Sequence, residues 1–150
     1  MADFPSVEWL ARRIVEAAGD AVLYAGRDGR IQWWNGGAEA IFGWSAAEAV
    51  GQSMDLIIPE RLRPRHWEGW DKSMATGVTR YSGRDLLAVP AQRKDGKPLS
   101  IEFTIQLVRD EAGALVGAAA IIRDVTERWN RDKELRRQLK ELQTQVGKGS

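Results

Sequence analysis

Residues 99–107, with the sequence LSIEFTIQL, alternate apolar and polar side chains without a break. Successive side chains of a β-strand point to opposite faces, so this pattern predicts a strand that is buried on one face only. A further strand is expected at 115–123, after the turn at 111–113, and another at 81–92, where Pro90 indicates an edge or a bulge. The second half of the chain therefore predicts three strands of one antiparallel sheet.

The first half of the chain carries shorter patterns that glycines and prolines separate. They predict, in order, a helix at 6–18, two strands around the Asp28-Gly29 turn at 21–35, short helices at 36–42, 45–48 and 54–58, and a longer helix at about 60–75 that ends at Gly77. Ser45 and Glu48 form a capping-box pattern at the start of the second short helix. Helices of this kind beside a single antiparallel sheet make an α+β domain.

The C-terminal part predicts a long polar helix that begins at 124–127, with Asp124 as an acidic N-cap. Its apolar positions are spaced by threes and fours, apart from one polar gap: Val125, Trp129, Leu135, Leu139, Leu142 and Val146. This spacing is typical of a coiled-coil seam, and with the amphipathic helix at 6–18 it predicts a parallel homodimer. The alternative is a solvated helix that pairs only in a longer protein. We therefore divide the chain into a cap helix at 1–19, a central domain at 20–124 and a coiled-coil helix at 125–150.

The composition argues against several classes of function. The 150 residues carry a net charge of +1, so nothing indicates nucleic acid or a membrane surface as a partner. We expect a cytoplasmic address, since no signal peptide and no apolar run of membrane-spanning length is seen. The absence of cysteine removes disulfides, thiolate nucleophiles and zinc ribbons. We expect no enzyme, because the sequence has no nucleophile elbow and no phosphate-binding glycine loop.

His66 is the only histidine of the chain, and it falls on the predicted helix at 60–75. With no cysteine present, its imidazole is the one good ligand for a soft or borderline metal such as haem iron. Trp67 and Trp70 flank it and could line a cofactor, although tryptophans at helical spacing more often belong to a core or a dimer contact. The alternative for His66 is a side chain that is exposed or simply packed.

Several short motifs occur together in one order along the chain. They are Asp28-Gly29-Arg30-Ile31 followed by Trp34-Asn35 and Ala38-Glu39, Phe42-Gly43-Trp44-Ser45 followed by Glu48 and Gly51, Arg93-Lys94-Asp95-Gly96, and Asp124-Val125-Thr126-Glu127. With these motifs, roughly residues 7–127 resemble a PAS domain. The resemblance implies a sensor domain at 20–124 with a five-stranded antiparallel sheet, short helices on one face, and a signal that leaves through residues 124–127.

Within this family, the positions of His66, Thr76-Gly77 and Lys94-Asp95-Gly96 are similar to those of haem-binding oxygen sensors of the FixL type. Segments 86–91 and 101–104 are similar to carbon monoxide regulators of the RcoM type. These resemblances imply haem b, with His66 as the ligand of the iron. Leu86 or Leu87 stands where FixL-type sensors place an arginine against the gas. An apolar side chain there favours carbon monoxide or nitric oxide over oxygen as the diatomic ligand.

The residues expected around the haem come from the helix and the sheet. Trp70 would line the cofactor, Lys72 and Arg80 could hold the propionates, and the sheet would contribute Leu86, Val89, Ile101, Phe103, Ile105 and Ile121. Binding of the gas would shift the strands that carry Phe103 and Ile121, and the change would reach the coiled coil and a downstream output domain outside this chain.

Other ligands are possible in the same fold. Light-sensing flavin domains of the LOV type need a cysteine, which this chain lacks. Without a cofactor, the domain would serve dimerisation and signal relay or bind a small metabolite, and the residues from the sheet would simply be core. A non-covalent flavin for redox sensing fits the seven tryptophans but has no diagnostic residue.

Overall fold

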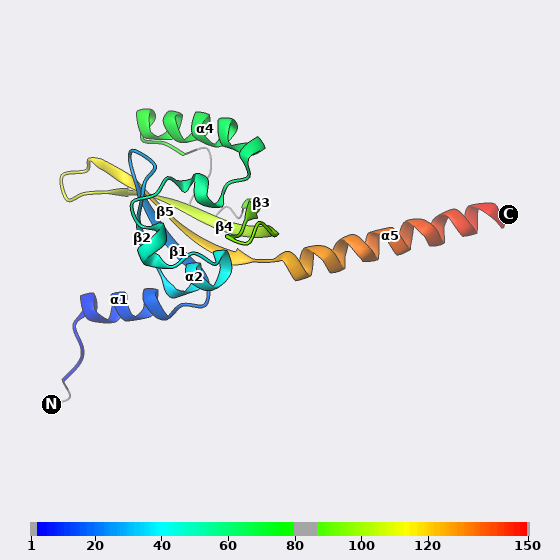
Figure 1. The fold of residues 1–150 in the computed structure, drawn as a ribbon, viewed down its shortest axis with the longest axis horizontal. Coiled ribbons are helices and arrows are strands. Elements are labelled where there is room, and N and C mark those ends of the chain that lie inside the picture. Colours follow the sequence, from blue (N-terminus) through cyan, green and yellow to red (C-terminus); the bar gives the residue numbers. More distant parts are fainter. Residues whose placement is uncertain (1–2, 80–86, 150) are drawn as a thin grey trace.

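The computed structural model describes residues 3–79 and 87–149. The strands are β1 (Ala21–Gly26), β2 (Ile31–Trp34), β3 (Leu87–Gln92), β4 (Pro98–Arg109) and β5 (Leu115–Asp124). The helices are α1 (Val7–Ala17), α2 (Gly36–Phe42), α3 (Ala46–Ala49), the 3₁₀ turns η1 (Met54–Ile57) and η2 (Glu60–Leu62), α4 (Arg63–Thr76) and α5 (Thr126–Lys148). The order of two strands, short helices, three strands and an exit helix is confirmed (Figure 1).

The five strands form one antiparallel sheet in the order β2-β1-β5-β4-β3, so the first hairpin pairs with the last strand. β3 lies at an edge of this sheet, where Pro90 sits opposite Ser100 on β4. Proline cannot donate to a central ladder, which explains its place on an edge strand. The predicted α+β class and five-stranded antiparallel sheet are confirmed.

Residues of α2, α3, η1 and α4 pack against one face of the sheet, and this face carries the core. The predicted alternation is confirmed in β4: Ile101 is buried on the covered face, and Glu102 points to the other face. The cluster of buried side chains includes Leu23, Ile31, Trp34, Phe42, Leu99, Ile101 and Ile122. The capping box of α3 is also confirmed, with Ser45 and Glu48 each bonded to the backbone of the other.

Two predicted elements differ in extent. The helix expected at 60–75 is divided into η2 and α4, which begins at Arg63 with Pro64 in its first turn. Proline has no N–H group and suits the first turn of a helix, so the α-helix starts there. Of the strand expected at 81–92, the structure contains β3 at Leu87–Gln92, and residues 81–86 lie outside the described residues.

The N-terminal helix α1 is joined to the domain through one buried polar side chain, Asn35. Its Nδ2 atom donates to the carbonyl oxygen of Val15 at 2.7 Å and of Asp20 at 3.1 Å. Its Oδ1 atom accepts from the backbone N–H groups of Val22 at 2.8 Å and Ala38 at 2.9 Å. One residue thus ties the C-terminal end of α1 to β1 and α2, while the body of α1 lies away from the sheet (Figure 1).

The C-terminal helix α5 leaves the sheet directly after β5 and extends away from the domain (Figure 1). The prediction of Asp124 as N-cap is wrong, because Asp124 is the last residue of β5 and Val125 takes the cap position. The Asp124 carboxylate instead accepts from the N–H of Thr126 at 2.9 Å. Within the described residues, none of the helices is long and apolar enough to cross a membrane.

Candidate ligand site around His66

His66 lies in the second turn of α4, on the side of this helix that packs toward the sheet. Residues four apart lie one above the other on a helix, so His66, Trp70 and Met74 share a face. Met74 is buried against Leu115 and Ala118 of β5, and Trp70 packs against the same cluster. Gly77 ends α4 in the left-handed conformation, with φ of 70°, as predicted.

The imidazole of His66 is half-buried and contacts two indole rings, which also contact each other. The ring of Trp67 stands edge-on at 4.6 Å between centroids, and that of Trp70 is stacked at 6.2 Å. The Nδ1 atom is buried without a hydrogen-bond partner among the described residues. Burial lowers the pKa of the His66 imidazole, and the carboxylate of Asp55 opposes this change. The environment therefore favours the neutral imidazole, which is the form that binds a metal.

The two indoles fix α4 to the turn between β1 and β2. Trp67 donates from Nε1 to Oδ1 of Asp55 at 2.7 Å, and Trp70 donates from Nε1 to the carbonyl oxygen of Arg27 at 3.0 Å. The six-membered ring of Trp67 lies directly over Gly29, where an added Cβ would come within 2.3 Å of the ring. Gly29 has a φ of 78°, so both the turn and the indole require glycine here.

Two arginines connect the end of α4 to the hairpin between β4 and β5. Arg27 donates to the carbonyl oxygens of Met74 at 3.1 Å and Leu115 at 3.2 Å. Arg109 donates to the carbonyl oxygens of Gly77 at 2.7 Å and Gly113 at 3.1 Å. Cationic groups at the C-terminal end of a helix satisfy its free carbonyls and its dipole. The helix that carries His66 is therefore fixed to the start of β5.

The sheet presents several predicted residues on the face that α4 covers. Ile101, Phe103 and Ile105 alternate along β4 on this side, with Ile101 buried and the other two half-buried. Val89 lies opposite Ile101 at the edge of the sheet and is 39% exposed. Leu87 lies opposite Phe103 and is half-buried. The structure thus brings four of the residues predicted to line the haem to one apolar surface, which Leu87 shares: Val89, Ile101, Phe103 and Ile105.

The prediction that Ile121 shares this surface is wrong. Ile121 pairs with Thr104 of β4 and is 53% exposed on the opposite face of the sheet. Its neighbour Ile122 lies opposite Phe103 and is only 3% exposed. Because side chains alternate along a strand, only one of the two isoleucines can face the core, and the register with β4 selects Ile122.

Lys72, the one predicted cationic residue that the structure describes, does not lie beside His66. Lys72 is exposed and lies two residues after Trp70, which places it on nearly the opposite side of α4. Arg80 and Leu86 lie outside the described residues. Lys72 is therefore corrected from a cofactor contact to a solvent-facing residue of α4.

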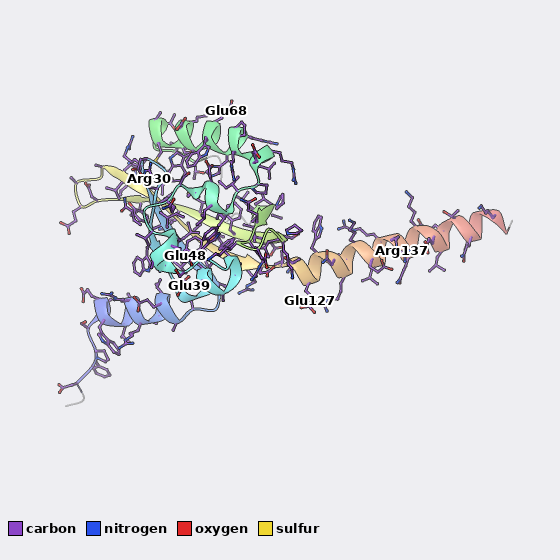
Figure 2. All side chains as sticks on the ribbon, viewed as in Figure 1. Arg30, Glu39, Glu48, Glu68, Glu127 and Arg137 are labelled. Atoms are coloured by element: carbon purple, nitrogen blue, oxygen red, sulfur yellow. The ribbon has the colours of Figure 1, made fainter. Side chains whose placement is uncertain are left out.

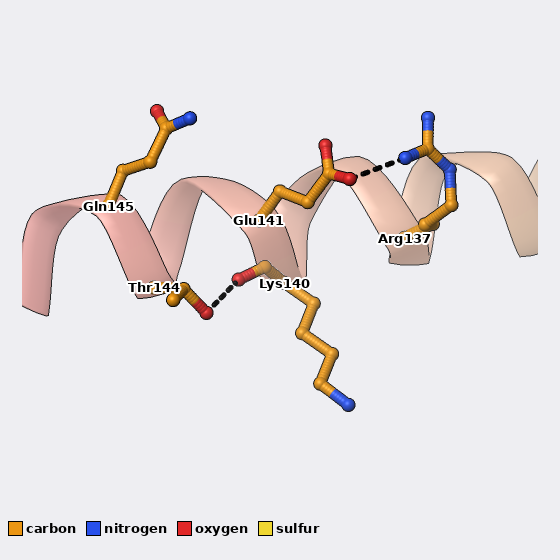
Figure 3. Close-up of a pocket in the computed structure, with 5 residues that line it drawn as sticks. All are labelled: Arg137, Lys140, Glu141, Thr144 and Gln145. Carbon is orange, nitrogen blue, oxygen red and sulfur yellow. Dashed lines mark hydrogen bonds and ion pairs between the residues drawn. The ribbon is translucent and has the colours of Figure 1, made fainter.

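Two surface hollows in the structure lie away from α4. One, of about 330 Å³, lies along α1 beside Trp9, Arg12, Arg13 and Glu16. The other, of about 370 Å³, lies along α5 (Figure 3). Among the described residues no three His, Cys, Asp or Glu side chains gather as a metal centre. A single imidazole such as that of His66 could hold a haem iron without such a cluster.

Sequence reasoning missed the residues that contact α4 and its two indoles. None of these residues stands near His66 in the sequence: Asp55 lies on η1, Arg27 and Gly29 lie in the first hairpin, and Arg109 lies on β4. Gly29 was predicted only as a turn residue, which gives no signal for an indole above it. The contacts with Asp55 and Arg27 depend on how α4 lies across the sheet, which no local pattern reveals.

Comparisons with known proteins agree on one fold. A family model described as the PAS fold matches residues 15–130. An uncharacterized protein of Azorhizobium caulinodans is 34% identical over 127 residues, which cover 84% of this chain and 17% of that protein. The sensor protein FixL of Bradyrhizobium diazoefficiens is 28% identical over 135 residues, 90% of this chain and 25% of that protein. The oxygen sensor protein DosP of Escherichia coli is 30% identical over 119 residues, 79% of this chain and 14% of that protein.

Solved structures show the same architecture. The PAS domain of a protein from Colwellia psychrerythraea superposes with a TM-score of 0.70 at 22% identity, covering 81% of this chain and 99% of that chain. An RNA-binding light-oxygen-voltage receptor gives a TM-score of 0.70 at 23% identity, covering 93% of this chain and 41% of that chain. At these identities the likeness shows the fold alone. The chain spans a quarter or less of the length of the curated relatives it matches.

Proposed function

Since this chain belongs to the PAS fold family and is a PAS sensor domain, we propose that it binds haem b through His66 and detects a diatomic gas. The observation that carries the proposal is the state of His66. Its imidazole is half-buried on the face of α4 that packs toward the sheet, its Nδ1 atom has no hydrogen-bond partner among the described residues, and burial lowers its pKa. The similarity to an oxygen sensor, DosP, and to the sensor FixL supports the same assignment.

The residues around α4 and β4 offer one imidazole, that of His66, and an apolar surface to a haem. Haem iron supplies the place where a diatomic gas binds. His66 would hold the iron through an imidazole nitrogen, and Phe103 and Ile105 would exclude water from the side of the sheet. Leu87 shares this surface with Phe103 and donates no hydrogen bond. Oxygen depends on such a donor more than carbon monoxide does, so we propose carbon monoxide or nitric oxide as the preferred gas.

The proposed signal leaves through the start of α5. Val125 donates its N–H to the carbonyl oxygen of Ser100 at 2.9 Å, and Ser100 donates its N–H to Oγ1 of Thr126 at 3.0 Å. Arg128 of α5 also pairs with Glu102 of β4. A movement of β4 would therefore reach the first turn of α5. We propose a sensing rather than a catalytic role, with an output domain beyond these residues.

We propose that the output is relayed by a parallel homodimer. The seam residues of α5, Leu135, Leu139, Leu142 and Val146, are all exposed in the single chain. On α1, Val7 and Ile14 are exposed in the same way. Apolar stripes at this spacing are buried when two helices pair, so a second copy of the chain would cover them. The proposal keeps 1–19, 20–124 and 125–150 as cap helix, sensor domain and coiled-coil helix.

The ultraviolet–visible spectrum tests the haem assignment. Protein mixed with hemin, then reduced with dithionite and exposed to carbon monoxide, should give a Soret band that shifts with the gas. His66→Ala should lose this spectrum while its far-ultraviolet circular dichroism stays that of the wild type. Glu68→Gln, two residues away on the outer side of α4 (Figure 2), should keep it. A His66→Ala spectrum equal to that of the wild type would overturn the assignment.

A second candidate is a PAS module that relays signals without a cofactor. It is favoured by the contacts of Trp67, Trp70 and the two arginines, which join α4 to η1 and to both hairpins through the protein's own side chains. This candidate predicts a bare tryptophan spectrum that hemin does not change. Bands of a flavin would instead support the non-covalent flavin interpretation, for which the similarity to a light-oxygen-voltage receptor gives the fold alone.

A further inference from the structure

The orientation of the His66 imidazole depends on its ring contacts. Its Nδ1 atom is buried without a hydrogen-bond partner among the described residues. The edge-on contact with Trp67, at 4.6 Å and 83° between ring planes, is closer than the stacked contact with Trp70 at 6.2 Å. Contacts that prevent rotation of the Trp67 indole therefore also limit rotation of the imidazole ring.

Trp67 is held from two sides. On one side its Nε1 atom donates to Oδ1 of Asp55 at 2.7 Å, at the short end of the range for an N–H···O hydrogen bond. On the other side its ring rests on the backbone of Gly29, which leaves no room for a Cβ. A rotation of the indole away from Gly29 would break the bond to Asp55, so the two contacts act together.

Asp55 is itself fixed by its backbone. The hydroxyl of Ser53 accepts from the N–H of Asp55 at 3.1 Å, and Arg63 donates to the carbonyl oxygen of Asp55 at 3.2 Å. The guanidinium of Arg63 also lies 3.9 Å from the Asp55 carboxylate. Asp55 is thus a fixed acceptor on η1, which precedes η2 and α4 in the chain.

We propose that Asp55 is a positioning residue for His66: it holds the indole of Trp67 by a hydrogen bond, and the indole holds the imidazole. The role is that of an acceptor and does not depend on the negative charge. This inference deepens the proposed function, since it concerns the side chain that would hold the haem iron. Its main test is made on the protein without haem.

Because the chain has one histidine, diethyl pyrocarbonate reports on His66 alone when the absorbance of carbethoxyhistidine is followed. The reaction is measured at about pH 8, where the imidazole is neutral in every variant. Asp55→Ala and Trp67→Phe should each raise the rate of modification about fivefold. The loss of one hydrogen bond is expected to raise the fraction of molecules in which the imidazole is accessible to the reagent by about this factor. Asp55→Asn keeps an oxygen acceptor and should react at the wild-type rate, as should the control Glu68→Gln.

Each other result contradicts the proposal. Wild-type modification rates in both Asp55→Ala and Trp67→Phe would overturn the proposal. A raised rate in Asp55→Asn would contradict the acceptor role, because it would show that the negative charge of Asp55 is required. If circular dichroism shows that Asp55→Ala does not fold, the modification rate of Trp67→Phe tests the proposal, because this variant keeps an aromatic ring over Gly29.

A titration with hemin separates this inference from the proposed function. About fivefold weaker binding by Asp55→Ala, and wild-type binding by Asp55→Asn, would support both. A wild-type protein that binds no hemin overturns the haem assignment and leaves the modification result standing. Equal hemin affinity in Asp55→Ala and the wild type would overturn the link between Asp55 and the haem.

Discussion

Asn35 donates from Nδ2 to the carbonyl oxygen of Val15 at 2.7 Å, which joins the start of α2 to the C-terminal end of α1. Asn35 is only 2% exposed, and its amide also serves backbone groups of β1 and α2. A helix whose apolar residues are exposed thus has a fixed direction, because its last turn is held by a buried amide.

We expect Asn35→Ala to lower the free energy of unfolding by about 3 kcal/mol, because it leaves several buried N–H and C=O groups without partners. Urea unfolding measures this change. Asn130→Ala, on the exposed surface of α5, is the matched control and should stay within about 0.5 kcal/mol of the wild type. Equal stability of both variants would contradict the role of Asn35.

Ile121 and Ile122 test which face of the sheet carries the core. Ile122→Ala should cost about 3 kcal/mol, since it leaves a cavity opposite Phe103. Ile121→Ala should cost less than about 1 kcal/mol, because its side chain is half exposed on the other face. The two unfolding curves are compared in urea, and the reverse order would show that the register of β5 is wrong.

Acid should destabilise the domain through His66. Burial lowers the pKa of its imidazole below the ordinary value of 6.5, against the opposing effect of Asp55. The unfolded chain then binds the proton more readily than the folded chain. The stability contributed by neutral His66 is complete above pH 6.5 and is lost as the pH falls through the lower folded pKa.

Between about pH 7 and about pH 5, the wild type should therefore lose more stability than His66→Gln, which has no imidazole to protonate. Urea unfolding at a series of pH values measures the difference. Parallel pH profiles for the two proteins would contradict the lowered pKa.

The exposed seam of α5 should control the oligomeric state. Leu139→Asp places a charge in the proposed helix pair and should convert a dimer to a monomer, as measured by size-exclusion chromatography with light scattering. Thr144→Asp, outside the seam on the same helix (Figure 3), should leave the dimer intact. A wild-type chain that is a monomer at all concentrations would contradict the homodimer proposal.

Much of the fold followed from local patterns. The alternation at 99–107 predicted β4, the Asp28-Gly29 pair predicted the first turn, and Ser45 with Glu48 predicted the cap of α3. These features depend on residues close together in the sequence, where propensity and side-chain spacing act directly. The sequence predicted Asp124 instead of Val125 as the N-cap of α5, because no local pattern shows that Asp124 pairs with Ile101 as the last residue of β5.

The candidate site depended on contacts between distant segments. The sequence marked His66 as the one histidine on a helix, and the structure agrees on the helix. It could not show that Asp55 holds Trp67, or that Gly29 lies beneath the indole, because these contacts follow from how α4 packs against η1 and against the first hairpin.

The sequence by itself determined most of the elements and their order. It also determined which reactive side chains the chain has, one histidine and no cysteine, and the apolar seam of the exit helix. The tertiary structure decided which side chains meet. Ile121 and Ile122 are chemically identical neighbours, and only pairing with β4 assigns one to the core and the other to the surface. Local propensity fixes where a strand or helix forms, whereas its register and packing are set by burial of the whole apolar surface at once.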